Sequence, residues 1–193
     1  FRATGDREFL GARFDLMDDL LLFMANRVIL DRGEDAVIRE CMSPDESPFD
    51  LKVNDTWTCA ITLRALEGLQ SAATLLGRTP RTPSPGILAA KLRRRLDRNV
   101  DAAGVLQSFE GGTRPHWGSL IFAHLPGHPA LRTTIDALLR NYDPALGVYN
   151  THAVSRYAEK SFPWTDFWVA RILAEAGDPK AGDLIAGQLR HSN

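Results

Sequence analysis

The sequence predicts an all-α protein built from antiparallel helical hairpins. Three observations support this: apolar residues recur every three to four positions over several long segments, short segments rich in glycine and proline separate them, and little of the chain alternates as a strand does. The 193 residues are 44% hydrophobic and 24% charged, which is typical of a globular chain. We therefore expect residues 1–193 to form a single domain.

The expected helices follow one another along the whole chain. The first covers residues 6–27, and the second begins near Asn54 or Asp55, with Asp55 or Thr56 as its N-cap, and ends at Gly77. The remaining expected helices cover residues 87–99, 119–123, 130–141, 164–176 and 179–190. Because only Gly177 and Asp178 separate the last two, these helices should form a hairpin.

The segments between the helices carry turn residues. We expect a short extended piece at residues 36–40, a proline-rich connector at 78–86 and a structured loop at 105–117. Residues 142–149 contain an Asp-Pro pair and a glycine, which predict a turn.

Charge and composition argue against several classes of partner. The net charge of −1 supplies no general field for nucleic acid, and the basic run at residues 91–95 is interpreted as a solvated helix face rather than an RNA-facing stripe. The longest dense apolar stretch, residues 20–25, is too short to span a membrane, and no signal peptide is expected. Cys41 and Cys59 are read as free thiols, which favours a reducing, cytoplasmic location.

Three loops concentrate carboxylates and aromatic residues. Carboxylates from separate loops, enclosed by aromatic walls, are typical of a sugar site because glycosidic cleavage uses two carboxyl groups. These residues alone do not rank such a site above a helical binding module. The residues concerned are Asp45 and Glu46 in the first loop, Glu110, His116 and Trp117 in the second, Glu159 and Trp164 in the third, and Trp57 and Tyr149 as further walls.

The order of several short segments resembles the C-terminal half of a six-hairpin, (α/α)6-barrel glycosidase. The resemblance is closest to glycoside hydrolase family 65 and its glucoamylase-like relatives, and it extends over nearly all of the chain. The segments are Thr4-Gly5-Asp6, Met42-Ser43-Pro44-Asp45-Glu46 (the family's G-P-D-E acid loop), Asn54-Asp55-Thr56-Trp57-Thr58 (its N-N-A-Y-T helix start), Ser108-Phe109-Glu110-Gly111 (its Q-F-E-G segment) and Ala174-Glu175-Ala176-Gly177-Asp178 (its final hairpin).

The resemblance implies an inverting hydrolase of α-glucosidic bonds. Glu46 would be the general acid, and Glu159, in a segment similar to the E-x-F-P-W of glucoamylase-like hydrolases, would be the base. The implied substrate-binding residues are Asp45, Trp57, Glu110, His116, Trp117 and Trp164. Two alternatives stay open: a glycoside phosphorylase of the same fold, and a non-catalytic helical domain that binds carbohydrate or serves as a scaffold.

Each candidate carboxylate also has a structural interpretation. Glu46 could cap a helix or pair with Arg39, Glu159 could be neutralised by Arg156 or Lys160, and Glu110 could simply hold its loop. No metal or other cofactor is expected, because Pro126 and Gly127 interrupt the helix that would align His124 with His128.

The number of helices implies a partner besides the carbohydrate substrate. A complete six-hairpin barrel has twelve helices, whereas this sequence predicts about six. The expected architecture is therefore about half of an (α/α)6 toroid, completed by the missing N-terminal half or by a second subunit.

Overall fold

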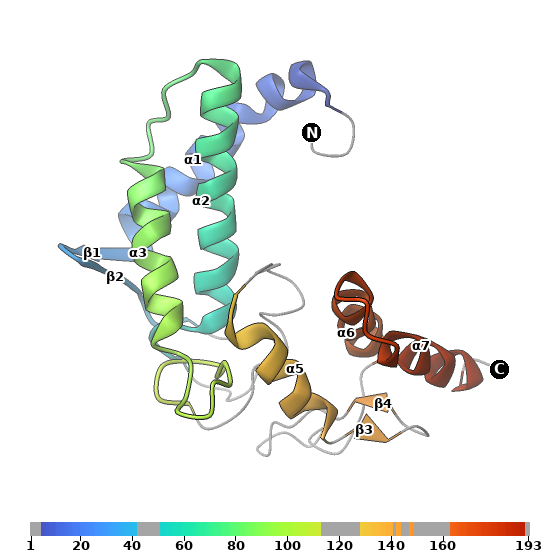
Figure 1. Ribbon diagram of the computed structural model, residues 1–193. Coiled ribbons are helices and arrows are strands. Elements are labelled where there is room, and N and C mark those ends of the chain that lie inside the picture. The colour runs from blue at the N-terminus through green and yellow to red at the C-terminus, as the bar shows by residue number, and fades with distance from the viewer. Residues whose placement is uncertain are drawn as a thin grey trace.

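Six helices and two small hairpins make up the part of the chain that the computed structural model describes, which is residues 5–41, 51–112, 128–140, 142–143, 147–148 and 163–191 (Figure 1). The helices are α1 (Arg7–Arg27), α2 (Thr56–Leu76), α3 (Pro85–Asp97), α5 (Ala130–Leu139), α6 (Pro163–Glu175) and α7 (Lys180–His191). The antiparallel hairpins are β1 (Ile29–Arg32) with β2 (Asp35–Ile38) and β3 (Tyr142–Asp143) with β4 (Gly147–Val148). The predicted mostly helical class is confirmed.

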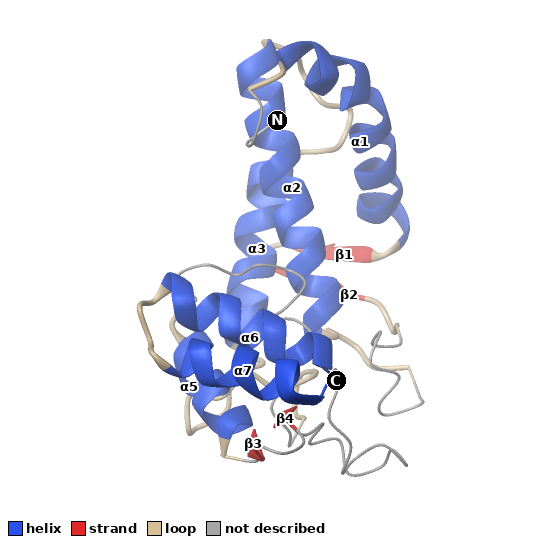
Figure 2. Ribbon diagram, turned by 90° about the vertical axis from the view of Figure 1, so that its right-hand side faces the viewer, coloured by secondary structure: helices blue, strands red, loops and turns tan. Residues whose placement is uncertain are grey.

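One hydrophobic cluster joins the elements. All six of these helices and both strands of the first hairpin contribute buried side chains to it, with Phe14, Leu63, Leu92, Ile135 and Leu173 among the most buried. Removing such apolar surface from water is the main force that holds helices together. Figure 2 shows α2 and α3 side by side, with α5, α6 and α7 grouped at one end of the pair.

The helix ends follow the sequence signals closely. Asp55 caps α2 by accepting a hydrogen bond from the backbone N–H of Thr58 (2.8 Å), and Gly77 ends the helix with φ of +64°, as predicted. Gly177, with φ of +71°, lies in the turn between α6 and α7. The predicted short helix at residues 119–123 lies outside the described residues.

The hairpin of β1 and β2 corrects the sequence prediction of one extended piece at residues 36–40. Strand β2 covers residues 35–38, and β1 was not predicted at all. Its four residues carry no helical or alternating pattern long enough to recognise, and the strand forms because Ile29, opposite Ile38, packs into the core. Gly33, with φ of +70°, lies in the turn between the two strands.

The basic run on α3 also departs from its predicted role as a solvated face. Lys91 and Arg95 are buried, and they form ion pairs with Asp31 and Asp35 of the first hairpin. Arg93 pairs with Glu67 of α2. The run therefore ties α3 to its neighbours, because a buried cation is stable only when it is paired.

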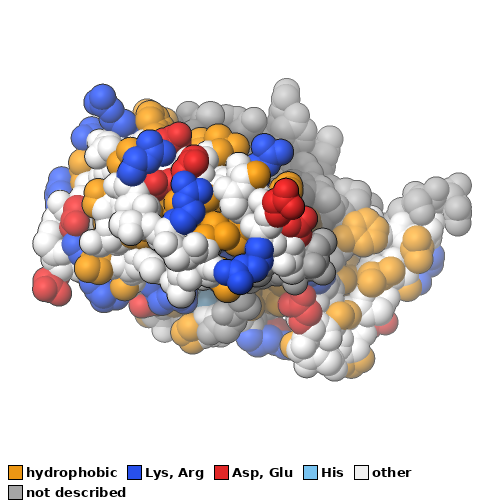
Figure 3. Space-filling view, turned by 90° about the horizontal axis from the view of Figure 1, so that it is seen from above, with side chains coloured by type: hydrophobic (Ala, Val, Ile, Leu, Met, Phe, Trp, Pro, Cys, Tyr) orange, Lys and Arg blue, Asp and Glu red, His pale blue; other side chains and the backbone are white. Residues whose placement is uncertain are grey.

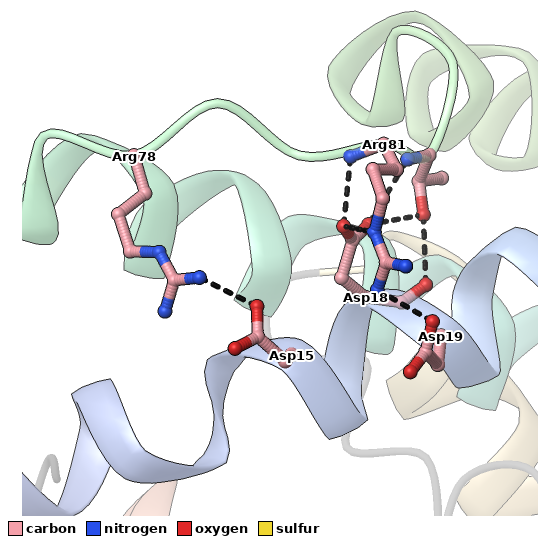
Figure 4. Close-up of polar contacts among 6 residues, drawn as sticks. Asp15, Asp18, Asp19, Arg78 and Arg81 are labelled. Carbon is pink, nitrogen blue, oxygen red and sulfur yellow. Dashed lines mark hydrogen bonds and ion pairs between the residues drawn. The ribbon is translucent and has the colours of Figure 1, made fainter.

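The connector between α2 and α3 is bound to α1. Asp18 of α1 is 1% exposed and accepts hydrogen bonds from the backbone N–H groups of Arg81 (2.7 Å) and Thr82 (2.9 Å). Figure 4 shows Arg81 reaching Asp18 and Asp19, and Arg78 reaching Asp15. These contacts tie the middle of α1 to the connector between α2 and α3.

None of the described helices has an apolar stretch of the length that crossing a bilayer requires.

Candidate functional site

Asn54 is the centre of a polar network at the start of α2. Its side chain is fully buried: Oδ1 accepts from the backbone N–H of Ile38 (2.9 Å), and Nδ2 donates to the Glu110 carboxylate (2.8 Å). Its carbonyl accepts from the side-chain amide of Asn99 (2.9 Å). The residue has φ of +57°, a conformation that asparagine tolerates better than most residues. One residue thus joins β2, α2, the end of α3 and the Glu110 segment.

The first turn of α2 is bonded to the segment that precedes Glu110. The backbone N–H of Thr56 donates to the carbonyl of Ser108 (2.9 Å), and its hydroxyl donates to the carbonyl of Gln107 (2.6 Å). Asn99 donates to the same hydroxyl oxygen (2.6 Å). These buried bonds fix the position of Glu110 relative to the helix start.

Glu110 also forms an ion pair with Arg95 of α3, with 3.0 Å between Oε2 and Nη2. The arginine side chain is 8% exposed and contacts Asp35 as well, whereas the Glu110 side chain is 39% exposed. Arg95 and Asn54 therefore hold one carboxylate oxygen of Glu110, Oε2, in place. The carboxylate group nevertheless remains partly exposed to solvent. A carboxylate held in this way can bind a ligand without first being ordered.

The loop that contains Asp45 and Glu46 begins and ends beside this network. Cys41 and Lys52 exchange two backbone hydrogen bonds, of 3.0 and 2.9 Å, so the chain returns to the same place after residues 42–50. The ammonium group of Lys52 lies 5.3 Å from the ring centre of Phe109, next to Glu110. Cys41 and Lys52, which we call the root of the loop, thus lie beside the Glu110 segment (residues 107–110), and Lys52 contacts it directly.

The two cysteines give the site no nucleophile. Burial raises the pKa of the Cys41 thiol, although its hydrogen bond to the hydroxyl of Thr58 (3.4 Å) acts in the opposite direction. Burial also raises the pKa of Cys59 well above its usual value. Both are therefore kept as thiols, the form that is a poor nucleophile and a poor metal ligand.

The structure places only some of the predicted site residues. Glu110 and Trp57 lie in the described region, with Trp57 on the first turn of α2, three positions after Asn54. The indole N–H of Trp57 is buried and has no hydrogen-bond partner among the described residues. Trp164 lies on the first turn of α6, but its side chain is outside the described part of the chain. Asp45, Glu46, His116, Trp117, Tyr149 and Glu159 lie outside the described residues.

The sequence did not single out Asn54, Asn99 or Arg95 as site residues. Asn54 belongs to the segment that resembles the family's helix start, but the sequence analysis used it only to locate the beginning of a helix. Arg95 is one of several cations close together in the sequence. In the described part of the chain, no three His, Cys, Asp or Glu side chains gather closely enough to hold a metal ion. His128 instead uses Nδ1 to accept from the backbone N–H of Ala130 (3.2 Å) at the start of α5.

Comparison with known proteins yields no match to a protein-family model, a curated protein or a solved structure.

Proposed function

We propose that this chain is part of an inverting glycoside hydrolase that cleaves α-glucosidic bonds. The observation that carries the proposal is the meeting of three separated segments at one end of α2: the root of loop 42–50, the helix start at Asn54, and Glu110. The helix start and Glu110 belong to the set of segments whose order resembles family 65 glycosidases, and the root of the loop flanks a third such segment, Met42–Glu46. Their direct bonding is an independent observation, because a resemblance in sequence order does not require contact in space.

In the proposed mechanism, Glu46 donates a proton to the leaving glycosidic oxygen. Glu159 removes a proton from water, and the resulting nucleophile attacks the anomeric carbon from the opposite face of the sugar. This requires a separation of about 6.5 to 9.5 Å between the two carboxyl groups, which leaves room for the water. The reaction transfers the elements of one water molecule and needs neither a metal ion nor another cofactor.

The remaining site residues bind the carbohydrate. Glu110, anchored by Asn54 and Arg95, accepts a hydrogen bond from a sugar hydroxyl. The other proposed substrate-binding residues are Asp45, Trp57, His116, Trp117 and Trp164. A nucleic-acid ligand is not proposed, and basic and acidic side chains are interspersed over the face seen in Figure 3.

A further helical half completes the proposed toroid, supplied either by another part of the same protein or by a second subunit. Helix α1 supports this proposal because Phe9, Leu16, Leu20 and Phe23 are each between 55% and 60% exposed. Their spacings of seven, four and three residues place them on one face, the arrangement by which a helix packs against another helix. An exposed apolar face of this kind marks an interaction site.

The proposed acid is tested by two substrates that differ in leaving group. In the complete protein, Glu46→Gln should lower turnover of an α-linked glucose disaccharide by about 10² to 10⁴. Turnover of nitrophenyl α-glucoside should fall much less, because nitrophenolate leaves without protonation. Glu159→Gln should lower both rates, and substrate binding should survive both changes.

Other outcomes distinguish the alternatives. Equal losses on both substrates in Glu46→Gln would remove Glu46 as the acid. If inorganic phosphate accelerates cleavage and a sugar phosphate is the product, the protein is a phosphorylase and Glu159 is not the base. Saturable binding of sugar without turnover of either substrate would instead indicate a non-catalytic carbohydrate-binding domain.

A further inference from the structure

A groove of about 600 Å³ lies along the outer face of the β1–β2 hairpin. Figure 1 shows this hairpin projecting beside α3, on the side of the molecule away from α7. Aliphatic side chains line much of the groove: Leu30, Val37, Leu51 and Val53, of which Leu51 is 58% and Val53 40% exposed. Its volume is in the range of small-molecule sites, which combine apolar walls with a few polar groups.

The pairing of the strands places two arginines on the same face as this aliphatic lining. Leu30 is directly opposite Val37, and Arg32 is two positions further along β1. Arg39 is two positions after Val37, one residue beyond the end of β2, where its backbone N–H still donates to the carbonyl of Val28 (2.9 Å). Because side chains alternate between faces of a strand, both arginines lie on the Leu30–Val37 face, about 13 Å apart along the hairpin at 3.3 Å per residue. Both line the groove, one at each end of the pair.

The two arginines differ from the third arginine of the groove. Arg95 is buried and neutralised by Asp35 and Glu110, and its Nε has no hydrogen-bond partner among the described residues. Arg32 and Arg39 are exposed, and neither forms an ion pair with any residue that the structure describes. Glu40, also exposed, is the one carboxylate among the described residues that line the groove. Of the charges on these described residues, two positive and one negative are left unneutralised.

We propose that this groove binds a small phosphate monoester. A guanidinium group presents a planar fork of N–H donors that matches phosphate oxygens. Because an arginine side chain is long and flexible, the guanidinium groups of Arg32 and Arg39 can both reach over the groove to one phosphoryl group, which carries two charges. The aliphatic floor beneath them accommodates the body of the ester. The proposal is independent of sugar cleavage, since it uses neither Glu46 nor Glu159.

The test is calorimetric titration with phenyl phosphate, glucose 6-phosphate and inorganic phosphate. Phenyl phosphate should bind most tightly, because its ring covers the aliphatic floor, and inorganic phosphate most weakly. Arg32→Gln and Arg39→Gln should each weaken binding about tenfold or more, since each removes a charge-assisted hydrogen-bond donor. Glu40→Gln should strengthen binding severalfold, because it removes the opposing charge.

Arg190→Gln on α7 is the matched control, since it makes the same chemical change on an exposed arginine away from the groove. It should leave the affinity unchanged. Arg32 and Arg39 form no ion pairs in the described structure, so their variants should keep the unfolding temperature of the parent protein. The proposal is overturned if no ester binds saturably, if inorganic phosphate binds as tightly as phenyl phosphate, or if Arg190→Gln weakens binding as much as Arg39→Gln. Loss of ester binding in Glu46→Gln would show that the ester occupies the proposed catalytic site instead.

Discussion

Asp18 of α1 and Thr82 of the α2–α3 connector are joined by two hydrogen bonds to a single carboxylate oxygen. The backbone N–H of Thr82 donates to Oδ1 over 2.9 Å, and its hydroxyl donates to the same atom over 2.7 Å. The backbone N–H of Arg81 donates to the second oxygen over 2.7 Å. Because Asp18 is almost fully buried, these donors replace the water that an exposed carboxylate would have.

Asp18→Asn should therefore destabilise the protein by about 1.5 to 3 kcal/mol, the range for hydrogen bonds to a charged group. The amide keeps the shape of the carboxylate but turns one acceptor into a donor that faces the connector. Asp15→Asn is the matched control: Asp15 is 68% exposed and its ion pair with Arg78 should contribute less than about 1 kcal/mol. Urea denaturation measures both free energies of unfolding. Equal losses would mean that the buried bonds contribute no more than an exposed pair.

The same carboxylate should make stability depend on acid pH. Burial acts to raise the pKa of Asp18, but the hydrogen bonds from Arg81 and Thr82 outweigh it and lower the pKa below its usual value. As pH falls, the unfolded chain is then protonated first, so the free energy of unfolding decreases from about pH 5 downward and through the lowered native pKa. Urea denaturation at pH 5, 4 and 3 should show this slope. It should be shallower in Asp18→Asn, and an unchanged slope would contradict the assignment.

His128 should give a second pH dependence, nearer neutrality. Burial lowers the pKa of His128 below 6.5, although the carboxylate of Asp97, 3.4 Å from Nε2, acts in the opposite direction. The unfolded state is therefore protonated first as pH falls through about 6.5, and stability declines until the native His128 also titrates. The NMR titration of the His128 ring measures its pKa directly. Asp97→Asn should lower this pKa further, and an unchanged or raised pKa would show that the two side chains do not interact as the structure indicates.

Asn54 and Glu110 should be energetically coupled. Asn54→Asp keeps an oxygen that accepts from the backbone N–H of Ile38. In the parent protein the Asn54 amide donates to Oε2 of Glu110, whereas the variant places a carboxylate oxygen against that atom. We expect a loss of about 1 to 3 kcal/mol. Aspartate also tolerates a positive φ, so backbone strain does not confound the comparison.

The double variant Asn54→Asp with Glu110→Gln completes the cycle. The glutamine amide can donate to the new carboxylate, so the double variant should lose less stability than the sum of the single variants, with an interaction energy of about 0.5 kcal/mol or more. Denaturant unfolding of all four proteins measures it. Strict additivity would mean that the hydrogen bond between the two side chains does not contribute to stability.

The helices of this protein could be predicted from the sequence because their signals are local. The Asp55 cap, the end at Gly77 and the turn at Gly177 each depend on residues within one helical turn, and the observed helices begin and end within about two residues of the predicted bounds. Glu110 could likewise be selected from its own short segment. Such features need no knowledge of distant parts of the chain.

The tertiary structure alone decided which residues surround Glu110 and what the basic run does. In the sequence, Asn54 is only the residue before a helix cap and Arg95 an ordinary helix-face residue, yet Asn54 bonds to a carboxylate 56 positions away and Arg95 is buried between Asp35 and Glu110. Strand β1, too, exists only because Ile29 packs into the core beside β2. Burial and pairing are properties of the assembled chain: the free energy that buries a cation or a short strand comes from partners that local sequence does not identify.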